Sequence, residues 1–88
     1  MNNKVKEIEI DLNLSADSII NKLQNRNLDF KEDWVRTAIF NLKDMELLKQ
    51  ERFLKDEQFD AIQSEIVNAL LAHLYFQNNW RFYTISIK

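Results

Sequence analysis

The chain contains no glycine and no proline, and this absence limits the turns that it can make. An average chain of 88 residues would hold roughly ten of the two types together. Turn positions with left-handed backbone must therefore use other residues, of which Asn is the usual substitute. Gly-rich phosphate loops and glycine-dependent tight hairpins are excluded. We expect a mostly helical chain with few and short connections.

The composition is that of one small globular unit, and we predict a single domain over residues 1–88. Hydrophobic residues make up 45% of the chain and charged residues 30%, which fits a globular fold and not disorder. There is no Cys, so neither a disulfide framework nor a thiolate metal site can form. The N-terminal segment MNNKVKEIEIDLN has no apolar run of the signal-peptide type. These features predict a cytoplasmic protein.

Residues 4–14, KVKEIEIDLNL, alternate apolar and polar side chains with the two-residue period of a half-buried strand. The apolar set points to one face and comprises Ile8, Ile10, Leu12 and Leu14. The polar set points to the other face and comprises Glu7, Glu9, Asp11 and Asn13. One face of this strand is therefore expected to lie on the core and the other in solvent.

Two helices are expected to follow the strand. Ser15 is a good N-cap for a helix over about 16–25, which an Asn would end where glycine often stands. Asp29 and Glu32 have the spacing of a capping box, which predicts that Asp29 caps a second helix. No helix-breaking residue follows, so this helix is expected to continue over 30–55.

A third helix is expected beyond a short break near Lys55–Asp56. Its apolar residues between 59 and 76 cover much of the helix circumference, which is typical of a helix buried on more than one side. Such a helix is either central in the fold or part of an oligomer interface, and we predict a homodimer. Residues 77–79 should end it, because the segment 80–87, WRFYTISI, is rich in the aromatic and β-branched residues of strands.

The predicted fold is α+β and mostly helical, in the order strand, helix, helix, helix, strand. A lone strand leaves backbone groups unpaired, which is costly when they are buried. The two terminal strands most simply pair with each other, as a small antiparallel sheet against a helical layer. Pairing across a dimer axis is the alternative.

No catalytic or metal-binding pattern is visible in the sequence. His73 is the single histidine, and its helical neighbours at three and four positions are Ala69, Leu70, Phe76 and Gln77. None of these is acidic, so a packed or hydrogen-bonded helix histidine is the expected role. A second His or a Cys, which a zinc site would need, does not occur. We expect no enzymatic activity, no cofactor and no metal.

The segment DWVRTAIFNL at residues 33–42 follows a predicted strand and helix, and it resembles the second helix of ribbon-helix-helix repressors. The resemblance implies that outward residues of a paired ribbon, here Glu7, Glu9 and Asp11, would enter the major groove. Carboxylates at these positions oppose the attraction of phosphate that dominates affinity for DNA. The net charge of −2 supplies no basic field. A nucleic-acid-binding transcriptional regulator is therefore the alternative hypothesis.

Half of the ten aromatic residues lie between Tyr75 and Tyr83, and no charged residue occurs over 66–80. The centres of protein interfaces are enriched in aromatic residues and depleted in charge. A small non-enzymatic protein-interaction module is thus the main hypothesis. Its partner-binding residues are expected on the outward side of the terminal strands: Trp80, Phe82, Thr84, Glu7, Glu9 and Asp11. An exposed edge strand could also accept a strand of the partner.

The composition also suggests a kind of partner. Small glycine-free chains rich in Lys, Asn and Ile are typical of accessory proteins of phages and mobile elements. An inhibitor that binds and blocks a host or defence protein is one form that the module could take. The uncharged run over 66–80 is too short and too polar to span a bilayer, so no membrane partner is expected.

Overall fold

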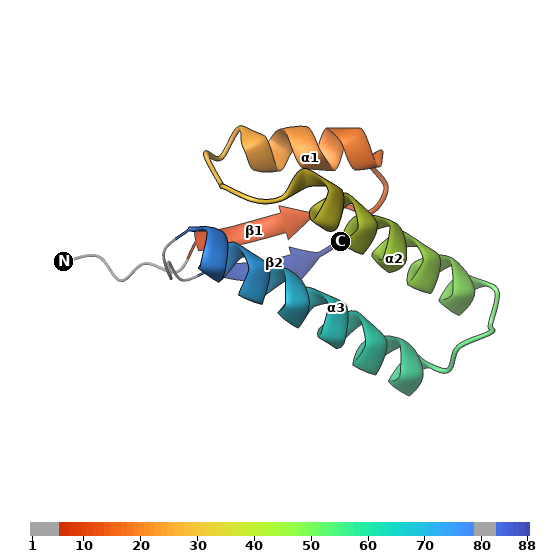
Figure 1. The fold of residues 1–88 in the computed structure, drawn as a ribbon. Coiled ribbons are helices and arrows are strands. Elements are labelled where there is room, and N and C mark those ends of the chain that lie inside the picture. Colours follow the sequence, from red (N-terminus) through yellow and green to blue (C-terminus); the bar gives the residue numbers. More distant parts are fainter. Residues whose placement is uncertain (1–5, 79–82) are drawn as a thin grey trace.

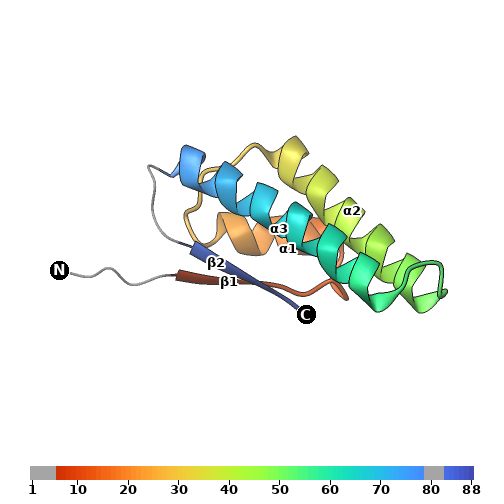
Figure 2. The same ribbon diagram turned by 90° about the horizontal axis from the view of Figure 1, so that it is seen from below.

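The computed structural model describes residues 6–78 and 83–88, which form a two-stranded sheet with three helices on one of its faces (Figure 1). The elements in chain order are β1 (Lys6–Ile10), α1 (Ala16–Gln24), α2 (Glu32–Gln50), α3 (Asp56–Gln77) and β2 (Tyr83–Ile87). Figure 2 shows both strands below the helices, so the helices cover one face of the sheet and no described element covers the other. The mostly helical α+β architecture is confirmed.

The terminal strands pair with each other in parallel, so the predicted antiparallel sheet is wrong. Ile8 lies opposite Ile85, and Ile10 lies opposite Ile87. The physical reason is that every connection reverses the chain (Figure 1). Three helices between two strands require four reversals, so β2 returns in the direction of β1. A parallel pair also needs a crossover of a dozen or more residues, which the helices supply.

The predicted alternation of β1 is confirmed, although the strand ends at Ile10 and not at the predicted 14; the predicted start at residue 4 lies outside the described residues. Ile8 and Ile10 are each only 1% exposed, whereas Glu7 and Glu9 are exposed. Tyr83, Ile85 and Ile87 of β2 face the same core, as predicted, and contribute one buried and two partly buried side chains. The rest of the core comes from Leu28, in the loop before α2, and from the helices: Ala16, Ile19, Ile20, Leu23, Val35, Ala38, Ile39, Leu42, Leu70 and Leu74.

The capping residue predicted for α1 is the one observed, whereas the capping residue predicted for α2 is not. Ser15 caps α1, since its Oγ accepts the backbone N–H of Ser18 at 3.1 Å. The predicted Asp29 cap is wrong, because α2 begins at Glu32 after Lys31, whose side chain makes no capping bond. The N–H of Asp29 donates instead to the side chain of Asn78.

Asn78 joins the loop before α2 to the end of α3. Its Oδ1 accepts the N–H of Asp29 at 2.9 Å, and its Nδ2 donates to the carbonyl oxygens of Asp29 at 2.8 Å and Leu74 at 2.9 Å. The side chain is buried, so these bonds satisfy groups that water cannot easily reach. The Asn-rich stop of the third helix therefore has a structural role that the sequence alone did not indicate.

Lys43 of α2 holds the loop that follows β1. Its Nζ donates to the carbonyl oxygen of Leu12 at 2.7 Å and to that of Leu14 at 2.6 Å. Neither carbonyl has a strand partner in this turn, so the ammonium group supplies two charge-assisted bonds. The contact fixes the point at which the chain leaves the sheet for α1.

The chain turns between α2 and α3 without glycine. α2 ends at Gln50, earlier than the predicted 55, and the break before Asp56 is confirmed. Arg52 has a φ of 63°, while Arg52 and Phe53 donate backbone N–H groups to the carbonyl oxygens of Lys49 and Leu48. These two bonds form a Schellman motif, in which the left-handed position usually holds glycine. Asn27 follows the end of α1 and has a φ of 58°, as expected for an Asn in place of glycine.

None of the helices in the described part of the chain is both long enough and apolar enough to cross a membrane.

We predict that Arg52→Gly stabilises the protein by about 1 kcal/mol, because a left-handed backbone is strained in a residue that has a Cβ atom. Urea denaturation measures the change. Arg26→Gly is the matched control, since Arg26 follows α1 without a positive φ and its replacement should stabilise nothing. Equal effects of the two substitutions would contradict the account.

We predict that Lys43→Met lowers the free energy of unfolding by about 2 kcal/mol, the range of a hydrogen bond from a charged group. Met keeps most of the aliphatic stem and removes the ammonium donor of the two bonds to Leu12 and Leu14. Lys22→Met is the control, because Lys22 is exposed on α1. If both variants unfold at the urea concentration of the native chain, Lys43 does not hold the loop.

Candidate functional site

The outer face of the sheet carries part of the predicted partner-binding set. Glu7 and Glu9 are exposed there, and Thr84 lies directly opposite Glu7 across the two strands. Asp11 lies beyond the end of β1, where its Oδ1 accepts the N–H of Asn13 at 2.9 Å. The other two predicted residues, Trp80 and Phe82, lie outside the described residues.

The described part of this face is polar. Glu9 pairs with the ammonium group of Lys88 at 2.7 Å, and Ser86 lies opposite Glu9 across the two strands. The aromatic anchors expected for a binding face are thus not among the described residues that the structure places here.

A shallow groove of about 290 Å³ lies between α2 and α3. We name it the helical groove, and its lining is Trp34, Thr37, Ala38, Asn41, Ile66 and Ala69. No lining residue is charged, although charged residues make up 30% of the chain. Trp34, Thr37, Asn41 and Ala69 are exposed on the surface of the protein. The groove is therefore an uncharged, partly apolar surface formed by two long helices.

Trp34 is an exposed aromatic side chain that is held in place. Its ring stacks on that of His73, with centroids 4.6 Å apart and planes inclined by 7°. The Nε2 atom of His73 in turn accepts the backbone N–H of Lys31 at 3.0 Å. Trp34 remains 39% exposed. The indole thus presents a face to solvent while its position is fixed by the end of α3.

The contacts of His73 favour the neutral imidazole. An Nε2 atom that accepts a hydrogen bond carries no proton, so the ring proton lies on Nδ1. Partial burial, and secondly the charge of Lys31, lower the pKa of His73 below its usual value. The prediction of a packed or hydrogen-bonded histidine is confirmed by these contacts.

The described residues that could bind a metal ion are those in 6–78 and 83–88. In this part of the chain no three His, Cys, Asp or Glu side chains come close enough together to hold a metal ion.

Sequence reasoning missed the helical groove, although a signal for it was present. Trp34, Thr37 and Asn41 recur at three and four positions, as do Ile66, Ala69 and His73, so each set lies along one flank of a helix. Both sets lack charge. What the sequence alone could not supply was that α2 and α3 pack antiparallel and bring the two flanks side by side.

Comparison of the chain with protein-family models, with curated proteins and with solved structures finds no match.

We predict that acidification destabilises the protein through His73. The folded-state pKa lies below the unfolded value of about 6.5, so the unfolded chain binds the proton first as the pH falls. The free energy of unfolding is therefore fully retained above about pH 6.5 and decreases below it, until folded His73 also becomes protonated. Protonated Nε2 would face the N–H donor of Lys31, although the charge itself is tolerated over an indole ring.

Urea denaturation between about pH 7.5 and pH 5.5 measures this loss, with His73→Gln as the control that cannot titrate. The variant should lose less stability over the interval than the native chain. An NMR titration of His73 in the folded chain gives its pKa directly, and a value above 6.5 would rule the mechanism out.

Proposed function

We propose that this protein is a small non-enzymatic binding module that acts in the cytoplasm and engages a partner protein through the helical groove. The observation that carries the proposal is Trp34, which is exposed yet fixed beside an uncharged groove. Tryptophan is among the residues most enriched at the energetic centres of interfaces. A side chain that is already ordered loses less conformational entropy on binding.

The shape and rim of the helical groove indicate what would bind there. Two packed antiparallel helices present a groove that suits the apolar face of a third helix. Three exposed carboxylates flank the uncharged surface, Asp33 and Asp44 on α2 and Glu65 on α3, against one cation, Lys31, beside His73. The expected partner is therefore an amphipathic helix with basic residues at its margins. The lack of Cys agrees with a reducing compartment.

The alternative function, nucleic-acid binding of the ribbon-helix-helix type, has less support. The resemblance implies a ribbon whose outward residues enter the DNA, and here the outward residues of β1 are Glu7 and Glu9. β1 is paired with β2 of its own chain. Carboxylates on that face would repel phosphate.

Two further expectations stay predictions: inhibition of a host or defence protein, and homodimerisation through α3. Sedimentation at tens of micromolar tests the homodimer.

The experiment is site-specific photo-crosslinking in the native host, with the crosslinking amino acid placed at Asn41 in the helical groove or at Thr84 on the sheet. The Asn41 position should capture a protein that the Thr84 position does not. The captured protein is then purified, and its affinity for the native chain is measured by calorimetry. We expect Trp34→Ala to weaken binding by at least about tenfold, as for an interface hot spot.

Phe53→Ala is the matched control, because Phe53 is 74% exposed in the turn between α2 and α3 and lies outside the groove. Ala69→Arg is a second test, since it fills the groove with a bulky residue of good helix propensity. Circular dichroism should show that the Trp34→Ala and Ala69→Arg variants remain folded. A partner that binds the Trp34 and Ala69 variants as tightly as the native chain would refute the proposed site.

A further inference from the structure

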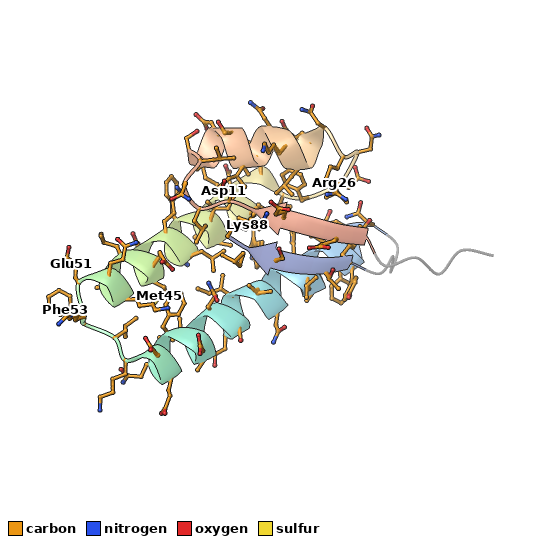
Figure 3. The ribbon with its side chains drawn as sticks, turned by 180° about the vertical axis from the view of Figure 1, so that it is seen from behind. Asp11, Arg26, Met45, Glu51, Phe53 and Lys88 are labelled. Carbon is orange, nitrogen blue, oxygen red and sulfur yellow. The ribbon has the colours of Figure 1, made fainter. Side chains whose placement is uncertain are left out.

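A second groove lies between the free edge of β1 and α1, on a different surface from the helical groove. We name it the edge groove; its volume is about 390 Å³, within the range of peptide and ligand sites. Ile8, Ile19 and Leu23 form its floor, and Lys22 lies on its helix side. Figure 3 labels Asp11 and Arg26, which line the groove toward its two ends.

The backbone of β1 offers hydrogen bonds along this groove. The carbonyl oxygen of Ile10 accepts the N–H of Lys88 at 2.8 Å, and Leu12 donates its N–H to Lys88 at 3.1 Å. Even-numbered residues of β1 therefore direct their backbone groups toward β2. Glu7 and Glu9 direct theirs to the opposite edge, where no other described element pairs with them. These are the donors and acceptors that an added strand would use.

The two edges of the sheet differ in how they are closed. At the β2 edge, the hydroxyl of Tyr75 donates to the carbonyl oxygen of Tyr83 at 3.1 Å, and α3 crosses over the strand (Figure 1). A groove of about 310 Å³ remains there between α3 and the side chains of Ile85 and Ile87. At the β1 edge, α1 stands off and leaves the edge groove (Figure 1). Parallel sheets of two strands with one bare face are unusual, because parallel pairing is ordinarily part of a larger sheet. Completion of the sheet is therefore expected at an edge, and we favour β1, because its groove is the larger of the two and no side-chain hydrogen bond like that of Tyr75 is described along it.

Charge determines what can occupy the edge. Outward side chains of an added strand would lie about 5 Å from Glu7 and Glu9, where opposite charges stabilise the pairing and like charges oppose it. A second copy that paired through β1 would place these same carboxylates against each other. Inward side chains would cover the apolar floor beside Lys22 and Arg26, which excludes basic residues on that side.

We propose that the edge groove binds an extended peptide segment of a partner protein as a third strand beside β1, with basic residues facing outward and apolar residues facing α1. Recognition uses the backbone groups of Glu7 and Glu9 for pairing and the floor at Ile8, Ile19 and Leu23 for the alternate side chains. Charge selection comes from the carboxylate of Glu7 and from that of Glu9, which Lys88 also pairs at 2.7 Å. The edge groove and the helical groove share no lining residue, so each proposal can be tested without the other.

The test is a titration of the full chain with a synthetic capped peptide of about seven residues that alternates lysine and valine, followed by residue-resolved amide hydrogen exchange. We expect the amides of Glu7 and Glu9 to exchange more slowly when the peptide is bound. The amides of Ile8 and Ile10, which already face β2, should change little. A peptide that alternates glutamate and valine should bind more weakly.

Two variants test the backbone and charge contributions, of which Glu9→Lys changes the charge alone. Glu9→Pro removes a donor at the free edge together with the carboxylate, and no backbone bond to β2, so the chain should fold and lose more peptide affinity than Glu9→Lys loses. Glu9→Lys should weaken binding of the lysine peptide about threefold and strengthen binding of the glutamate peptide. Trp34→Ala, in the helical groove, should leave both affinities unchanged.

The proposal is overturned if the lysine peptide does not slow exchange at Glu7 and Glu9 at millimolar concentration. It is also overturned if the peptide protects amides of α2 or α3 instead, or if both peptides bind equally. A further outcome concerns the chain without peptide. If exchange at Glu7 and Glu9 then slows as the protein concentration rises, the edge pairs with a second copy of the chain, and the charge argument is wrong.

Discussion

Reversal of chain direction at every connection is the constraint on which the rest of this structure depends. It makes β1 and β2 parallel, because three helices stand between them. It also makes α2 and α3 antiparallel, so that Trp34 near the start of one helix meets His73 near the end of the other. The same reversals carry α1 back beside β1, where the edge groove forms (Figure 1). Both candidate binding surfaces thus follow from one topological rule.

The turns that produce these reversals are stabilised by side chains, since glycine and proline are absent. Asn27 and Arg52 adopt the left-handed backbone that glycine would take without strain. Lys43 binds the carbonyl oxygens of the turn after β1, and Asn78 binds the loop before α2 from the end of α3. Each of these contacts joins residues that are distant in sequence. The stability of the turns is therefore coupled to the packing of the helices.

Local patterns predicted the elements well and their arrangement poorly. The alternation of β1, the Ser15 cap and the end of α3 could be predicted, because each depends on side chains within a few residues. The parallel pairing could have been obtained by counting reversals, had every connection been assumed to turn back. The Asp29 cap failed because a tertiary bond to Asn78 took the backbone group that a capping box needs. The helical groove could not be predicted, since it depends on which flanks of α2 and α3 meet.

The two grooves differ in the physical basis of their selectivity. The helical groove has no charged lining residue, so apolar contact with Trp34 and Ile66 would supply affinity and the acidic rim would only orient the partner. The edge groove offers backbone pairing, which any extended chain could use, and its selectivity must come from Glu7 and Glu9. The same carboxylates oppose pairing between copies of this chain. A charge pattern that protects an open edge from self-association is thus also a pattern that selects a basic partner, and β1 needs both properties because α1 leaves it uncovered.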